Sequence, residues 1–154
     1  MHESAILSIS AVTATDEEAL AGLISEFCGL PTSADQIRQR LARSTGIEHP
    51  VLARFDQEVV GFASLRLLYY LGEDAPYAEI SELYVRAAYR QQGIGRALLA
   101  VLETEARRAG ATGWSVLTGE DNHAARALYE RRGFQPFSIA LQTWFGDERP
   151  YREG

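Results

Sequence analysis

The stretch from Glu79 to Arg108 constrains the fold most, because it joins a strand pattern, a glycine-containing turn and a helix pattern. Its first part, EISELYV, is rich in apolar, aromatic and β-branched residues and predicts a buried strand. Its last part places apolar residues at steps of three and four, which predicts an amphipathic helix with one buried stripe. The stripe consists of Ile94, Leu98, Val101, Leu102, Ala106 and Ala109. The chain is therefore expected to run from a buried strand through a short turn into a long helix.

The turn between these elements reads RQQGIGR and spans 90–96. The first amides of a helix lack partners within the helix and carry the positive end of its dipole, so a turn that exposes them favours an anion. Gly93 and Gly95 lack a Cβ that would keep a ligand at a distance, and Arg90 and Arg96 add positive charge. One interpretation is a pyrophosphate site, and the other is an ordinary turn with solvated arginines. The glycine spacing matches neither the P-loop nor the dinucleotide-binding fingerprint.

Ahead of this stretch the sequence predicts a strand, two helices and a hairpin. Residues 5–12 alternate between apolar and polar side chains, as a half-buried strand does. Capping boxes at 15–18 and 33–36 predict the first turns of two helices. Residues 51–55 and 59–70 predict the two arms of a hairpin.

After the long helix the chain again alternates strand and helix. Residues 113–118 predict a strand, 124–132 a helix, and 134–145 a final extended segment. The charged tail at 146–154 is expected to be flexible. The chain has 154 residues and no internal repeat or linker, so a single domain over 1–154 is expected.

Charge and cysteine content limit the classes of partner. The formal net charge is −6, which argues against nucleic acid or an anionic membrane and favours a cationic substrate. No apolar run is long enough to span a bilayer and the N-terminal residues do not resemble a signal peptide, so a cytoplasmic protein is expected. For the lone Cys28, a buried apolar role is favoured over a reactive thiol. No group of residues suggests a metal site.

A second pattern lies in the last predicted helix. Asn122, Ala125 and Tyr129 are spaced at i, i+3 and i+7, which places them on one helical face. Such a face can follow an extended ligand, or it can pack into the core with the tyrosine hydroxyl satisfied by a carbonyl. Spacing alone favours the core.

The turn RQQGIGR resembles the R/Q-x-x-G-x-G/A signature of the GNAT superfamily of N-acetyltransferases, and NHAARALYERRGF resembles the second signature of that family. The similarity extends over roughly residues 5–145. It implies a GNAT-like α/β (α+β) fold, with a mixed central sheet of about six to seven strands flanked by about four helices on both faces. It also implies an acetyl-CoA-dependent N-acetyltransferase without a metal. The acceptor would be a primary amine of a small molecule or peptide, which attacks directly in a ternary complex.

The resemblance assigns roles to individual residues. The backbone of Leu83, Tyr84 and Val85 would pair with the pantetheine arm of coenzyme A like an added strand, beside an amide that stabilises negative charge on the thioester oxygen. Asn122 and Ala125 would contact the same arm, and Tyr129 would protonate the departing thiolate or donate a hydrogen bond to it. The residues that would bind the pyrophosphate are Arg90, Gln91, Gln92, Gly93, Ile94, Gly95 and Arg96.

Glu79 and Glu82 are the candidates for the base that deprotonates the incoming ammonium. Strand alternation sends them to opposite faces unless the strand is bulged. Some members of the family have a general-base glutamate at the same sequence distance before the turn as Glu79. The resemblance therefore favours Glu79 weakly. A mechanism that needs neither carboxylate stays open.

The acceptor is expected to be cationic, such as a polyamine, an amino-sugar antibiotic or a peptide amine, because acidic residues stand at 73, 74, 79 and 82. Two alternatives remain open: a non-catalytic acyl-CoA-binding regulatory module, and an acyltransferase with a longer acyl donor. The family often ends in a two-stranded hairpin, for which the chain after Gly133 is short. A homodimer in which a partner supplies the last strand is therefore compatible with the sequence.

Overall fold

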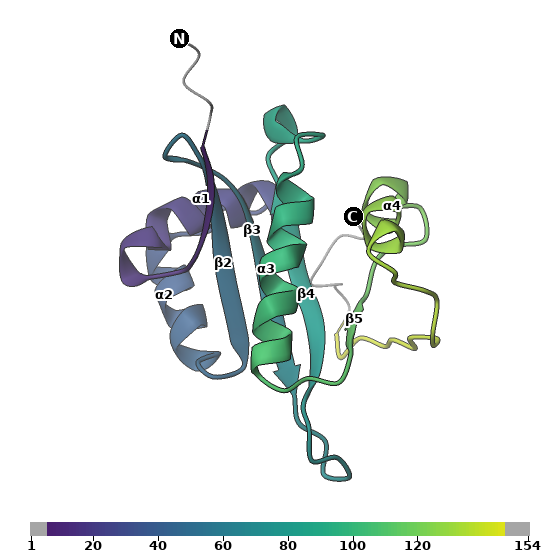
Figure 1. Ribbon diagram of the computed structural model, residues 1–154. Coiled ribbons are helices and arrows are strands. Elements are labelled where there is room, and N and C mark those ends of the chain that lie inside the picture. The colour runs from purple at the N-terminus through teal and green to yellow at the C-terminus, as the bar shows by residue number, and fades with distance from the viewer. Residues whose placement is uncertain (1–5, 147–154) are drawn as a thin grey trace. The chain divides into compact units, whose positions relative to one another are not determined.

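The computed structural model describes residues 6–146, which contain five strands, four α-helices and two short 3-10 helices (Figure 1). The chain divides into two compact units, one ending at Val116 and one beginning at Leu117. The first unit holds the whole sheet and three of the helices.

The first unit is built on one five-stranded sheet in the order β1-β2-β3-β4-β5. Neighbouring strands are antiparallel except for β4 and β5, which are parallel because α3 connects them as a crossover. The strands are Leu7–Ala11 (β1), Glu48–Phe55 (β2), Glu58–Leu68 (β3), Tyr77–Val85 (β4) and Trp114–Val116 (β5). The predicted hairpin of β2 and β3 is present. Its two-residue turn has positive φ at Asp56 and Gln57, as a type I′ turn requires.

Helices cover both faces of this sheet, as expected. Figure 1 shows α3 (Ile94–Arg108) on one face, with α1 (Glu17–Cys28) and α2 (Ala34–Arg43) on the other. The stripe of α3 is buried at Ile94, Leu98, Leu99, Leu102 and Ala106. On the opposite face, Leu20, Leu23 and Ile24 of α1 pack with Ile37 of α2 and with Leu52 and Phe62 of the sheet.

The starts of α1 and α2 test the two predicted capping boxes. The second box is confirmed, because Ser33 Oγ accepts from Gln36 N and Gln36 Oε1 accepts from Ser33 N, at 3.2 and 2.8 Å. The first is wrong by two residues. Asp16 is turned back onto Thr13, whose backbone N donates to Asp16 Oδ2 at 2.8 Å. This box precedes a short 3-10 helix, Ala14–Asp16, that leads into α1.

The second unit contains α4 (His123–Arg131). Asn122 is its N-cap, and the helix ends where Gly133 takes a φ of 94°. The expected count of six to seven strands is too high, because residues 134–146 form no regular strand in the described part of the chain. Pro136 lacks a backbone donor there, and Phe137, Ile139 and Leu141 are at least 88% exposed. Residues 147–154, most of the expected flexible tail, lie outside the described residues.

None of the helices among the described residues is both long enough and apolar enough to cross a membrane.

Candidate active site

The first part of the candidate site is an open edge of β4. β3 pairs with β4 along its whole length, whereas β5 pairs only with Ala78, Glu79 and Ile80. In the part of the chain that the structure describes, no strand pairs with residues 81–85 on the β5 side. Such an edge is a template for an extended ligand, which can add to it as a strand.

The register shows which backbone groups face this edge. Arg86 N donates to Val60 O at 2.8 Å, so the backbone of Arg86 faces β3. Backbone groups alternate in direction along an antiparallel strand, so those of Tyr84 also face β3. Those of Leu83 and Val85 then face the open edge. Of the three residues expected to pair with a ligand, Leu83 and Val85 therefore direct their backbone N–H and C=O groups to the open edge. Those of Tyr84 are directed to β3.

The second part of the site is the turn that follows β4. The hydrogen-bond ladder of α3 begins where Ala97 N donates to Gly93 O at 3.0 Å. The backbone amides of residues 91–96 donate to no described residue. This row of free amides at a helix start has the geometry that binds an anion.

Two residues in this turn have left-handed backbone conformations. Gly93 has a φ of 82° and is the N-cap of α3, and Gln91 has a φ of 63°. Positive φ is the expected reason for glycine at 93. Gly95 lies in the first turn of the helix and is not among the residues with positive φ, so its value to a ligand would be close backbone approach.

The two arginines of the turn differ in their surroundings. Arg90 donates from Nε to Val85 O at 2.9 Å, and its guanidinium lies 5.6 Å from the centre of the Tyr84 ring. Arg90 therefore ties the turn to the end of β4. Arg96 is exposed and forms no ion pair with a described residue, so its charge is available to a ligand.

The two candidate bases lie on one face because β4 is bulged. Glu79 is opposite Arg66 and Glu82 is opposite Ser64, which leaves Ser81 as an extra residue without a partner. Opposite residues share a face, and Ser64 and Arg66 share one because they are two apart on β3. This is the face covered by α1 and α2, where Phe62 and Tyr84 pack in the core cluster.

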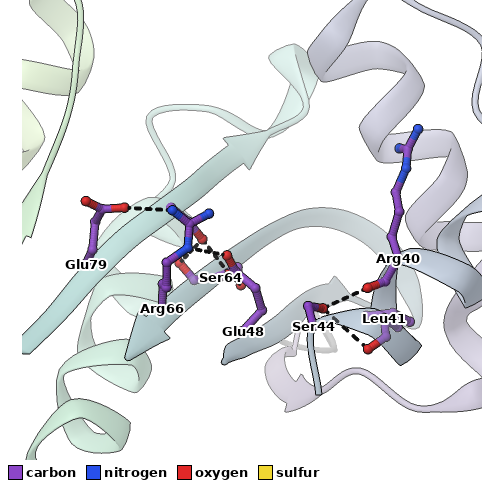
Figure 2. A network of polar contacts seen from close by, with 8 residues as sticks. Arg40, Leu41, Ser44, Glu48, Ser64, Arg66 and Glu79 are labelled. Atoms are coloured by element: carbon purple, nitrogen blue, oxygen red, sulfur yellow. Dashed lines mark hydrogen bonds and ion pairs between the residues drawn. The ribbon is translucent and has the colours of Figure 1, made fainter. Parts of the chain in front are cut away.

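A polar network occupies this face beside the bulge (Figure 2). Glu48 of β2 accepts from Ser64 Oγ at 2.5 Å and from Ser81 Oγ at 2.7 Å through the same oxygen, Oε2. Its other oxygen accepts from Arg66 Nε at 2.8 Å. Arg66 also contacts Glu79, with 3.2 Å between Nη1 and Oε1. Glu79 is therefore held in an ion pair.

Glu82 has a different environment. Its carboxyl accepts no hydrogen bond and forms no ion pair with any described residue, although its backbone pairs with β3. Burial raises the pKa of Glu82, and the negative charge of Glu48 raises it further, while Arg66 and Arg40 oppose the shift. For Glu48, burial alone would raise the pKa, but the hydrogen bonds from Ser64 and Ser81 and the contact with Arg66 outweigh it and lower the pKa. One carboxyl is thus held charged and its neighbour is made more basic.

Arg40 of α2 also acts on Glu82, and Glu82 in turn acts on Cys28 of α1. Arg40 of α2 is exposed and forms no ion pair with the described residues, yet its charge acts on both Glu82 and Cys28. Burial and then Glu82 raise the pKa of Cys28, which keeps the thiol protonated and supports the apolar role expected for it. Figure 2 shows Arg40 on the α2 side of the network. Glu73 and Asp74, the other acids in the sequence argument, are exposed in the loop between β3 and β4.

The second unit holds the remaining predicted residues. Asn122 Oδ1 accepts from Ala125 N at 3.3 Å, so this side chain caps α4 and keeps only its amide group for a ligand. Tyr129 packs edge-on against Phe134, with ring centroids 5.6 Å apart. Its hydroxyl bonds to no described residue, which differs from the satisfied hydroxyl of the core interpretation. Burial raises the pKa of Tyr129 to about 12.

Sequence reasoning missed the network around Glu48. Ser64 and Arg66 were visible as polar residues within an apolar strand, but Glu48 lies before Pro50, where no strand was predicted. Within the described residues, no group of three or more His, Cys, Asp or Glu side chains could hold a metal ion.

Comparison with known proteins gives four findings. Residues 16–134 match the model of the acetyltransferase (GNAT) family. An aminoalkylphosphonate N-acetyltransferase of Salmonella typhimurium is 39% identical over 87 residues, which are 56% of this chain and 56% of that protein, so the match spans about half the relative's length. A ribosomal-protein-alanine N-acetyltransferase from Brucella melitensis superposes with a TM-score of 0.77 at 19% identity, over 90% of this chain and 99% of that one. The aminoglycoside N-acetyltransferase AAC(6')-Iy in complex with CoA superposes with a TM-score of 0.81 at 17% identity, over 94% and 97%.

Proposed function

The chain belongs to the acetyltransferase (GNAT) family, and from this membership we propose that it transfers an acetyl group from acetyl-CoA to a primary amine by direct attack. One observation carries the proposal. The open edge of β4 is followed, after a short 3-10 helix at Ala87–Tyr89, by a turn whose amides, from Gln91 to Arg96, have no partner among the described residues. A ligand with an amide-containing arm and a pyrophosphate matches this order of backbone groups.

The proposed binding roles follow from that order. The outward backbone groups of Leu83 and Val85 pair with the pantetheine arm, and the amides of residues 91–96 hold the pyrophosphate with help from Arg96. Asn122, at the start of α4, contacts the arm through its free amide group. Acetyl-CoA supplies an activated thioester, whose oxygen becomes negative during attack and needs a donor from the β4 edge.

We assign the role of general base to Glu82 rather than to Glu79, which the resemblance had favoured. Glu79 is paired with Arg66, whereas Glu82 is half-buried, unpaired among the described residues and has a raised pKa. A more basic carboxyl takes a proton from an ammonium more readily at neutral pH. Glu82 therefore removes the proton from the bound acceptor, directly or through a water.

Tyr129 is proposed as a hydrogen-bond donor to the leaving thiolate. A phenol with a pKa of about 12 is a much weaker acid than a thiol, whose ordinary pKa is about 8.5. Full proton transfer to sulfur is therefore unfavourable, while the phenol stays protonated and able to donate over the whole working pH range.

The acidic face of the network favours a cationic acceptor such as a polyamine or an amino sugar. A second acceptor class is favoured by Arg40, which has no acidic partner among the described residues but acts electrostatically on Glu82. An amine that also carries an anionic group, as the name of the Salmonella relative indicates for that protein, would place its ammonium at Glu82 and its anion at Arg40.

The first test is calorimetric titration of the protein with acetyl-CoA. We expect binding by the wild type and its loss in Gly93→Val, because valine strains a backbone with positive φ and would reshape the turn. Gly46→Val is the matched control, since Gly46 has a φ of 78° and equally open surroundings but lies away from the turn. Loss of binding in both variants, or no binding by the wild type, would remove the basis of the proposal.

The second test is a panel of amines with detection of the free thiol of coenzyme A. Turnover of any amine separates an enzyme from a non-catalytic acyl-CoA-binding module, and a series of acyl donors tests the longer-acyl alternative. If aminoalkylphosphonates are turned over faster than diamines or amino sugars, Arg40→Gln should raise their KM at least tenfold and leave the KM of a diamine nearly unchanged. The reverse preference would support the cationic acceptor.

A further inference from the structure

We propose that Glu48 is a positioning residue for Glu82, because it clamps the bulge of β4 from two strands away and its charge acts on Glu82 across the same face. This inference rests on the proposed function, in which Glu82 is the base. It extends that function to a residue of β2, a strand to which neither the sequence patterns nor the proposed site assigned a role.

The clamp consists of the two hydrogen bonds that the Glu48 carboxylate accepts from β3 and β4. Glu48 stands on β2, yet its Oε2 accepts from Ser64 Oγ on β3 and from Ser81 Oγ on β4. Ser81 is the extra residue of the bulge, and its hydroxyl also lies 3.3 Å from Ser64 O. The carboxylate therefore contacts the one residue of β4 that has no partner in the β3 ladder.

The bulge determines where Glu82 points. Without the extra residue, Glu79 and Glu82 would lie on opposite faces, because side chains alternate along a strand. With Ser81 bulged, Glu82 lies opposite Ser64 on the face of α1 and α2. A contact that holds Ser81 in the bulge thus also holds the Glu82 carboxyl on the side where the acceptor is proposed to bind.

Glu48 also acts on Glu82 through its negative charge. The charges that act on Glu82 come from three elements: Arg40 of α2, Glu48 of β2 and Arg66 of β3. Two further titratable groups are coupled to this set, because Glu82 raises the pKa of Cys28 of α1 and Glu79 of β4 is ion-paired with Arg66. Glu48 raises the pKa of Glu82 and the two arginines lower it. Three donors, Ser64, Ser81 and Arg66, keep Glu48 ionised at neutral pH. A fixed negative charge on this face therefore makes Glu82 a stronger base.

The clamp and the charge can be separated by two substitutions. Glu48→Gln keeps the length and shape of the side chain and one acceptor oxygen but removes the charge. Ser81→Ala removes the single hydroxyl that joins Glu48 to the bulge and leaves the charge in place. Glu18→Gln is the matched control, because it removes the same charge from an exposed position at the start of α1.

The test that does not depend on turnover is an NMR titration of the Glu82 side-chain carboxyl carbon, in the wild type and in each variant. We expect the Glu82 midpoint to move to lower pH in Glu48→Gln and to stay unchanged in Glu18→Gln. In Ser81→Ala we expect a changed Glu82 chemical shift at a pH where the carboxyl is ionised. A Glu82 midpoint that is the same in Glu48→Gln and the wild type would overturn the proposal.

Kinetics provide the second readout. The acidic limb of the kcat/KM profile should move to lower pH in Glu48→Gln, and kcat should fall about tenfold in Ser81→Ala with the dissociation constant for acetyl-CoA unchanged. If Glu48→Gln does not fold, Ser81→Ala carries the test, and unchanged kcat together with an unchanged Glu82 shift would overturn the clamp. Failure of the proposed base is a separate result, since Glu82→Gln would then keep its activity whatever the Glu48 variants do.

Discussion

At the scale of single residues, the site depends on two carboxyl groups whose pKa values are shifted in opposite directions on the same face of the sheet. Glu48 is held ionised by three donors, whereas the carboxyl of Glu82 is half-buried without a partner among the described residues. An enzyme that uses a carboxylate as a base gains from such a shift, but the folded state loses stability, because the charged form of Glu82 is poorly solvated.

Because the charged form of Glu82 is poorly solvated, Glu82→Gln is predicted to stabilise the folded state at neutral pH. The pKa of Glu82 is higher in the folded than in the unfolded state, so the folded state binds the proton more tightly and stability falls as pH rises through the folded pKa. We therefore expect Glu82→Gln to melt a few degrees above the wild type at pH 7 to 8, with the difference vanishing below pH 4. Melting curves across this pH range measure it.

Glu48→Gln is expected to have the opposite effect on stability. The pKa of Glu48 is lowered, so its contribution is present above the unfolded pKa and is lost as pH falls through the folded pKa. Glu48→Gln should lower the free energy of unfolding by about 1–3 kcal/mol at neutral pH, because hydrogen bonds to a charged acceptor are lost. A Glu82→Gln protein that is less stable than the wild type at pH 8 would contradict the assigned environment.

At the scale of elements, close contact of β3 with β4 beside the site depends on Gly61. A Cβ at this position would lie 2.8 Å from the backbone oxygen of Tyr84, and a backbone atom cannot move aside as a side chain can. Gly61→Ala should therefore separate the two strands and lower the free energy of unfolding by about 1–3 kcal/mol. It should also weaken binding of acetyl-CoA, because Leu83 and Val85 would shift with the strand.

Gly22→Ala in α1 is the matched control for this prediction. The nearest atom to a Cβ at Gly22 is Arg86 Nη2 at 3.9 Å, and alanine is favoured over glycine inside a helix by roughly 0.5–1 kcal/mol. Urea unfolding of both variants, with calorimetric titration of acetyl-CoA, measures the two effects. Equal stability of Gly61→Ala and Gly22→Ala would show that the two strands are not in such close contact.

Local sequence patterns predict the elements from β4 to α3 but not the contacts between strands. The strand, turn and helix from β4 to α3 were predictable because periodicity, a left-handed glycine and free helix amides are local properties. The bulge at Ser81 was not, since it depends on the register with β3, and Glu48 was missed because Pro50 indicated a break. Pro50 is tolerated because it lies at the end of the β1–β2 ladder, where its carbonyl still accepts from Val12 N at 3.0 Å and only the return hydrogen bond is missing.

At the scale of the whole molecule, the two signatures fall in different compact units. The turn at 90–96 and the open edge of β4 belong to the first unit, whereas Asn122 and Tyr129 belong to the second. Acetyl-CoA bound at the turn and the open edge of the first unit, as the proposed function requires, would bind the folded chain and not the unfolded one. Ligand binding should therefore stabilise the whole protein by mass action.

At a ligand concentration a hundred times the dissociation constant, a ligand that binds only the folded state raises the free energy of unfolding by about 2.7 kcal/mol. For a chain of this length each kcal/mol raises the melting temperature by about 2–4 °C, so acetyl-CoA should raise it by about 5–10 °C. Gly93→Val should lose this shift, whereas Gly46→Val should melt lower than the wild type without ligand but keep the full shift. Because both glycines have positive φ and open surroundings, a shift lost equally in both variants would mean that backbone strain, and not the turn before α3, governs the response to acetyl-CoA.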